Sequence, residues 1–120
     1  MLTGALIIES LRVGAVLDDP GLVVQRLTRV EPTDVTPAQP GVWTLLEFRS
    51  DNADPGQLAE SLSRVLDAPG WYASFHSDGQ VFVVFPARVF QYPREADAQH
   101  EEVLAYAASV GIPNEQCDWR

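Results

Sequence analysis

This chain of 120 residues, with 46% hydrophobic and 21% charged residues, has the size and composition of one globular domain spanning residues 1–120. Its formal net charge is −9, and residues 51–120 hold eleven acids against four arginines, so the surface should repel phosphate and we expect no nucleic-acid binding. The single cysteine, Cys117, excludes an intrachain disulfide, and the lack of a long apolar run or a basic leader predicts a cytoplasmic protein that does not bind membranes.

The first part of the chain is expected to form three β-strands. Apolar and β-branched residues fill 2–13 and 22–31, and the DDPG segment at 18–21 marks a turn between these two strands. Three prolines predict a loop over 31–41. The sequence VWTLLEFR then predicts a third strand over 42–49.

A helix is predicted to begin at Pro55. Asp54 is placed to cap it, and Gln57 stands at the third helical position, as in a capping box. Apolar residues then recur with the spacing of one helical face, at Leu58, Leu62, Val65 and Leu66. Pro69 and Gly70 end the helical pattern.

The aromatic-rich segment 71–92, WYASFHSDGQVFVVFPARVFQY, predicts three more strands. A second helix is expected over 95–110, with acids at its N-terminal end and Gly111 just past its C-terminal end. Trp119 should fold back onto the body of the protein. The predicted fold class is α+β, an antiparallel or mixed β-sheet of about six strands with two helices packed on one face.

The register of the aromatic strands decides which side chains need a cover. Asp78 and Gly79 favour a two-residue type I′ turn, which places Phe75 opposite Phe82. One face then carries Trp71, Ala73, Phe75, Phe82 and Val84, and we expect both helices there. The opposite face carries Tyr72, Ser74, His76, Val81, Val83 and Phe85.

The turn at Pro86 determines where the last strand points its aromatic residues. Proline cannot adopt the positive φ of a type I′ turn, so we expect a longer loop built on a type I turn. A three-residue loop would send Phe90 and Tyr92 into the helix-covered core, whereas a four-residue loop would leave them on an apolar patch that needs a partner. The candidate interaction surface is therefore Tyr72, His76, Val81, Val83, Phe85, Phe90 and Tyr92.

The residues that could carry catalysis match no known motif. Ser74 and His76 point to the same side of their strand with Asp78 beyond them, but residues two apart on a strand lie about 7 Å apart, too far for a direct hydrogen bond. Cys117 stands beside Glu115 and Asp118, whose charges should raise the pKa of the thiol. We therefore assign no catalytic residue.

Metal and cofactor chemistry is no better supported. His76 and His100 have acidic neighbours but not the spacing of a zinc or iron site. The glycines occur singly, so no phosphate-binding loop is present. The strand carboxylates Glu9, Glu31 and Glu47 fit a solvated face better than a paired active site. We expect no metal and no cofactor.

The second half of the chain resembles a group of small bacterial proteins without an assigned function. The resemblance rests on GWYASFHSDGQVFVVFPARVFQYPR and on AYAASVGIPNEQCDW, whose GWY start and GIPxxQxDW ending are the most specific parts. It implies the order of strands and helices, and it implies no substrate, cofactor or catalytic residue.

Three kinds of function remain open. The sequence favours a non-enzymatic protein-interaction module, either a homodimer or an adaptor that binds another protein through its β-sheet face. A small-molecule-binding or enzymatic domain is the first alternative, with a pocket between helix and sheet lined by Tyr72, His76 and Tyr92. The second is an acidic inhibitor or immunity-type protein whose C-terminal half blocks a basic enzyme site.

Overall fold

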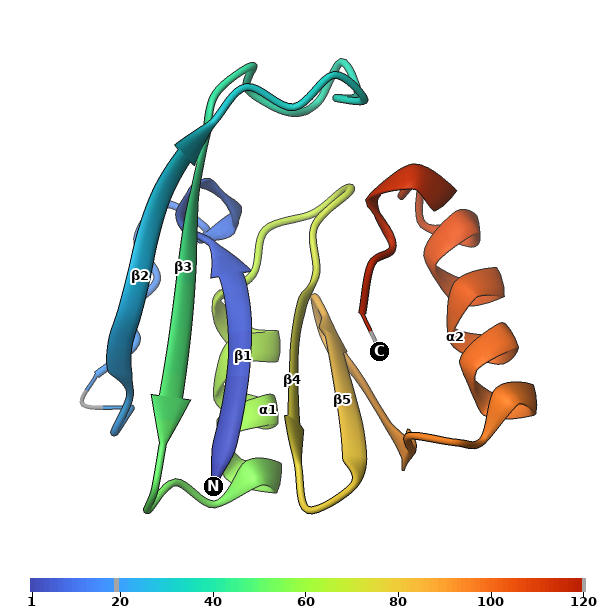
Figure 1. Ribbon diagram of the computed structural model, residues 1–120. Coiled ribbons are helices and arrows are strands. Elements are labelled where there is room, and N and C mark those ends of the chain that lie inside the picture. The colour runs from blue at the N-terminus through green and yellow to red at the C-terminus, as the bar shows by residue number, and fades with distance from the viewer. Residues whose placement is uncertain (19, 120) are drawn as a thin grey trace.

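The computed structural model describes residues 1–18 and 20–119, so Asp19 of the predicted turn lies outside the described residues. Its described part contains one antiparallel sheet of six strands in the order β2-β3-β1-β4-β5-β6, with two α-helices (Figure 1). The strands are β1 (Leu2–Ile7), β2 (Val23–Val30), β3 (Trp43–Ser50), β4 (Ala73–Ser77), β5 (Gln80–Phe85) and β6 (Arg88–Pro93). The helices are α1 (Pro55–Val65) and α2 (Asp97–Ser109), with short 3-10 turns at η1 (Ile8–Ser10) and η2 (Asn114–Gln116). The predicted α+β class is confirmed.

Helix α1 begins where the sequence predicts. The Asp54 carboxylate accepts a hydrogen bond of 3.0 Å from the backbone N–H of Gln57, which satisfies one of the N–H groups that a helix leaves unpaired at its start. Its predicted apolar stripe is buried, at Leu58, Leu62, Val65 and Leu66. Helix α2 also ends as predicted, because Gly111 adopts a φ of +86° directly beyond the last turn.

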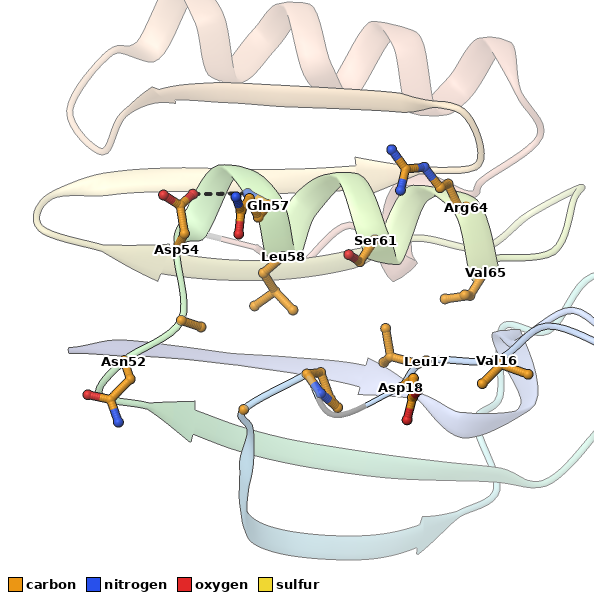
Figure 2. A pocket seen from close by; sticks show the side chains of 13 residues that line it. Val16, Leu17, Asp18, Asn52, Asp54, Gln57, Leu58, Ser61, Arg64 and Val65 are labelled. Carbon is orange, nitrogen blue, oxygen red and sulfur yellow. Dashed lines mark hydrogen bonds between the residues drawn. The ribbon is translucent and has the colours of Figure 1, made fainter.

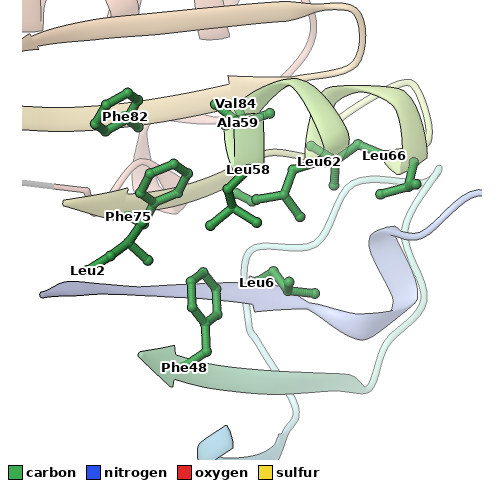
Figure 3. Packing of buried hydrophobic residues seen from close by; sticks show 12 residues of the cluster. Leu2, Leu6, Phe48, Leu58, Ala59, Leu62, Leu66, Phe75, Phe82 and Val84 are labelled. Atoms are coloured by element: carbon green, nitrogen blue, oxygen red, sulfur yellow. The ribbon is translucent and has the colours of Figure 1, made fainter. Parts of the chain in front are cut away.

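The first face of the sheet packs against α1. Alternate residues of four strands meet the apolar stripe of the helix, and this cluster includes Leu2, Leu6, Phe48, Ala73, Phe75, Phe82 and Val84 (Figure 3). Phe75 and Phe82, opposite each other in β4 and β5, stack with ring centroids 4.7 Å apart. Gly4 lets β1 approach this stack, since a Cβ there would lie 2.3 Å from the Cβ of Phe75.

The second helix lies on the other face, which corrects the expectation of two helices on one face. Helix α2 contributes Val103 and Ala107 to a separate buried cluster with Val81, Val83, Phe85, Tyr92, Ile112 and Trp119. In β5, Val81, Val83 and Phe85 alternate with Phe82 and Val84, which face α1. Strand β5 is apolar on both faces, so each face needs its own cover. The α1 layer and the α2 layer therefore enclose β5 between them (Figure 1).

The predicted turn between β4 and β5 is confirmed, whereas both predicted lengths of the loop at Pro86 are wrong. Asp78 and Gly79 both have positive φ, at +50° and +78°, and Phe75 lies opposite Phe82 as predicted. After β5, Phe85 pairs with Arg88, so only Pro86 and Ala87 form the loop.

Ala87 makes this short loop possible. A proline followed by a residue of positive φ is typical of a type II turn, and Ala87 has a φ of +62°. Its backbone N–H donates a hydrogen bond of 3.0 Å to the carbonyl of Ser63 in α1, which holds the residue in this unfavourable conformation. Two-residue and four-residue loops have the same parity, so Phe90 and Tyr92 lie on the face of Val83, as the four-residue alternative required.

In the described residues, neither helix has both the length and the apolar character required to cross a membrane.

Candidate functional site

The predicted interaction surface is mostly interior. Val81, Val83, Phe85 and Tyr92 are buried beneath α2 and the C-terminal segment, Tyr72 and Phe90 are half-buried, and His76 is exposed. Phe90 is further covered by the ring of Tyr106 and by the guanidinium of Arg88, which lies 4.7 Å from the centre of the Phe90 ring. The apolar face expected to need an outside partner is covered by this chain's own α2.

The C-terminal segment completes this cover, as predicted for Trp119. The indole N–H of Trp119 donates a hydrogen bond of 2.9 Å to the hydroxyl of Tyr92, and that hydroxyl lies 3.0 Å from Nδ1 of His100. The Trp119 ring meets the ring of Tyr72 edge to face, with centroids 4.9 Å apart. These contacts hold the segment after η2 against Tyr72, which precedes β4, and against Tyr92 of β6.

The same face remains open over β3, β1 and β4, where it forms a groove. Two adjoining cavities of about 350 and 330 Å³ share Ala5, Glu47, Ser74 and Asp118. Ala5 pairs with Glu47 on one side and with Ser74 on the other, so these three residues form the floor. We call the two cavities together the sheet groove. Asp118 and Trp119 of the C-terminal segment line it, as does the β2–β3 loop through Asp34.

A network of amide side chains joins these two lining segments. The side-chain amide of Gln39 donates a hydrogen bond of 2.8 Å to the carbonyl of Gly70. The side-chain amide of Gln116 donates one of 2.7 Å to the carbonyl of Asp34. The two amides also bond to each other, at 3.2 and 2.9 Å. Because Gln39 is buried, this network fixes the β2–β3 loop against η2 and sets one end of the groove.

The lining of the groove is acidic and aromatic. It contains the carboxylates of Asp34, Glu47, Glu115 and Asp118 and the rings of Trp43, Trp71, Tyr72 and Trp119, with Phe48, Phe75 and His76 at one end. No arginine is among the described residues of the lining. Among the described residues only Glu47 of these four acids has an ion pair, at 3.8 Å to Arg26. The groove therefore presents negative potential beside aromatic surface, a combination that attracts cations.

Tyr72 and Asp118 meet at the junction of the two cavities. The Tyr72 hydroxyl lies 2.7 Å from Oδ1 of Asp118 and 2.5 Å from the carbonyl of Gln116. Burial, and then the charge of Asp118, raises the pKa of Tyr72, so this hydroxyl keeps its proton. A hydroxyl has one proton to donate, and it can satisfy only one of these two acceptors at a time.

The residues considered for catalysis do not assemble into a site. No hydrogen bond joins Ser74 to His76 in the described structure, and the His76 ring instead lies 3.3 Å from Oγ1 of Thr3 on the neighbouring strand. Cys117 is half-buried, and its burial, then Asp118 and Glu115, raises the pKa of the thiol to about 11, which confirms the predicted direction. The thiol is therefore a poor nucleophile at neutral pH.

Of the three carboxylates expected on strands, only Glu47 lies in one, since Glu9 is in η1 and Glu31 directly follows β2. Glu9 accepts hydrogen bonds from the backbone N–H and the hydroxyl of Thr44 and lies 3.6 Å from Arg29. Burial opposes ionisation of Glu9, but these contacts outweigh it and lower the pKa of the carboxyl. Glu47 lines the sheet groove, and Glu31 is exposed. No group of three His, Cys, Asp or Glu residues in the described ranges is arranged to hold a metal ion.

A third cavity, of about 440 Å³, lies between α1 and the segment before β2 (Figure 2). Asp54, Gln57, Ser61 and Arg64 line it on the α1 side, and Leu17 and Asp18 line it on the other. The Asp54 carboxylate is already used to cap α1, and the lining mixes opposite charges without a common direction. It favours no ligand class.

Strand β2 forms an exposed edge of the sheet. Val23, Val24 and Leu27 are 46%, 52% and 60% exposed, and they lie on both faces of the strand. Its pairing with β3 shifts between Val24 and Arg26, so the regular part of the strand is Arg26–Val30.

The sequence indicates Tyr72, His76 and Glu47 as candidates, but it does not indicate the groove that contains them. The missing members are Asp34 and Trp43 from the β2–β3 loop and the start of β3, and Asp118 from the C-terminal segment. Comparison with known proteins adds no candidate, since no family model, curated protein or solved structure matches this chain. The resemblance to small bacterial proteins stays a prediction.

Proposed function

We propose that this chain is a non-enzymatic protein-interaction module whose sheet groove binds a basic, extended segment of a partner protein. The observation that carries this proposal is the composition of the groove, whose described lining has four carboxylates beside tryptophan and tyrosine rings and no arginine. An acidic groove attracts a basic segment and repels acidic ones, so charge sets the specificity.

The position of the groove supports an extended segment. The two cavities follow one another along β3, β1 and β4, and their shared residues make them continuous. A partner segment lying along them would place successive side chains against the carboxylates of Asp34, Glu47 and Asp118. The absence of an assembled nucleophile and base among the described residues favours binding over catalysis.

Peptide binding tests this proposal directly. On a random peptide array, the chain should select peptides enriched in arginine and lysine, and added salt should weaken binding because the attraction is electrostatic. Replacing Asp34 or Asp118 with asparagine should weaken the selected peptides about twofold to fivefold each, the range of exposed ion pairs. Asp97→Asn is the matched control, since this exposed acid on α2 does not line the groove. The proposal would be wrong if the selected peptides were not enriched in basic residues, or if replacing the groove carboxylates left peptide binding unchanged.

Self-association through β2 is a second candidate, favoured by the exposed apolar residues of this edge strand. A two-fold axis at Thr28 lets the regular segment Arg26–Val30 pair with its copy antiparallel, with Thr28 opposite Thr28 and Leu27 opposite Arg29. Arg26 and Arg29 already have partners at Glu47 and Glu9 of their own chain. This register sets no like charges opposite each other.

Sedimentation analysis distinguishes this dimer from a monomer. We expect a dimer at high micromolar concentration that Leu27→Lys dissociates, because the new lysine would face Arg29 of the second copy. Val16→Lys, at a position 77% exposed and outside β2, should leave the dimer intact. A monomeric native chain would exclude this candidate.

A further inference from the structure

At the junction of the two cavities, one hydroxyl donor of the described residues faces two hydrogen-bond acceptors. The Tyr72 hydroxyl lies within 2.7 Å of both the Asp118 carboxylate and the Gln116 carbonyl, yet it has one proton. The backbone N–H of Asp118 does not help, since it points back to the Tyr72 oxygen at 3.3 Å. Asp118 also has no ion pair among the described residues. Asp118 is exposed, so a donor from outside can reach the acceptor positions of its carboxylate that no described residue occupies.

We propose that this junction binds the guanidinium group of an arginine side chain. The inference rests on the proposed function, because it names the side chain by which the basic segment is anchored in the sheet groove. A guanidinium carries five N–H donors in a rigid plane, so it can bond to the Asp118 carboxylate and to the Gln116 carbonyl at the same time. An ammonium is a compact point charge that lacks this planar fork.

The aromatic residues around the junction favour the same ligand. Trp43, Trp71 and Tyr72 line the cavity that also contains Gln116 and Asp118. Trp43 and Trp71 hold each other edge to face, with centroids 5.2 Å apart, and Trp43 is fixed further by a 2.8 Å hydrogen bond from its indole N–H to the carbonyl of Pro40. Guanidinium groups stack on such rings and lose less hydration than ammonium groups do.

The further acids of this cavity complete a cationic site. Asp34, Glu47 and Glu115 line the same cavity as Asp118, so the potential at the junction is negative from several directions. No arginine or lysine is among the described residues that line this cavity. The ligand class is thus a planar, singly charged cation of side-chain size, presented by an arginine in an extended chain.

Titration of the intact protein with small probes tests this site. The probes are N-acetyl-arginine amide, N-acetyl-lysine amide and N-acetyl-citrulline amide, followed by amide chemical shifts and tryptophan fluorescence at low salt. We expect arginine to bind about fivefold more tightly than lysine, because its planar fork can bond to the Asp118 carboxylate and the Gln116 carbonyl at the same time. Citrulline, which keeps the shape and loses the charge, should not bind. Shifts should concentrate at Tyr72, Gln116 and Asp118.

Two variants separate this inference from the proposed function. Asp118→Asn should abolish the preference for arginine over lysine, and Asp97→Asn should retain it; the fluorescence and shift spectra of each variant show that it is folded. Equal binding of arginine and lysine would overturn the guanidinium site while leaving an acidic groove for basic segments. Absence of arginine binding would overturn it as well, and the peptide array then decides the proposed function independently.

Discussion

Replacing Val83 with aspartate should unfold most of the protein under native conditions. Val83 is fully buried in β5, within the cluster formed by α2 and the C-terminal segment. An aspartate there would place an unpaired charge in an apolar interior, which costs several kcal/mol, on the scale of the roughly 5–15 kcal/mol that stabilises a whole domain. Circular dichroism and urea denaturation measure the loss.

The matched control for this substitution is Val13→Asp. Val13 is 96% exposed, so the same chemical change should alter the free energy of unfolding by no more than about 0.5 kcal/mol. A folded Val83→Asp protein whose only change is its state of association would show that the α2-side cluster opens in solution. That result would restore this face as an interaction surface.

Replacing Trp119 with alanine should cost about 3–5 kcal/mol of the free energy of unfolding, the range for removing a buried tryptophan. The Trp119 ring is almost fully buried, and it packs against Tyr72 and donates to the hydroxyl of Tyr92. The variant should also weaken the binding of basic peptides, because the C-terminal segment that carries Asp118 would lose its anchor.

Trp119→Phe separates packing from hydrogen bonding at this position. Phenylalanine keeps an aromatic ring against Tyr72 but has no N–H for Tyr92, so we expect a loss nearer to 1–2 kcal/mol, since one buried hydrogen bond and a little volume disappear. Chemical denaturation of the three proteins gives both values. A loss below about 1 kcal/mol for Trp119→Ala would mean that the C-terminal segment contributes little to the fold.

Local signals in the sequence predicted the start of α1, the β4–β5 turn and the end of α2 correctly, because their causes are local. The strand expected over 2–13 is shorter, since β1 ends at Ile7. Asp54, Pro55 and Gln57 start α1 through contacts within one helical turn. Asp78 and Gly79 set the β4–β5 register through their own backbone preference for positive φ. Gly111 ends α2 for the same reason.

The position of α2 could be seen only in the tertiary structure, although the sequence of β5 indicates that both of its faces are buried. The run VFVVF in β5 is apolar at five consecutive positions, which is typical of a strand buried on both faces. It does not reveal which helix covers which face, because a helix after β6 can turn to either side of the sheet. The length of the loop at Pro86 differs from the prediction for a related reason. Ala87 keeps its positive φ because its N–H bonds to the carbonyl of Ser63, 24 positions earlier in the chain.

The sequence by itself determined the order of strands and helices, the β4–β5 register, the burial of Trp119 and the acidic character of the surface. Only the tertiary structure decided that α2 covers the second aromatic face and that the remaining part of that face is a groove. The physical reason is separation along the chain: the groove brings Asp34, Glu47, Tyr72 and Asp118 together from four distant segments. The spacing of these residues in the sequence does not predict that they lie close together. Their proximity results from the order of the strands in the sheet and from the return of the C-terminal segment.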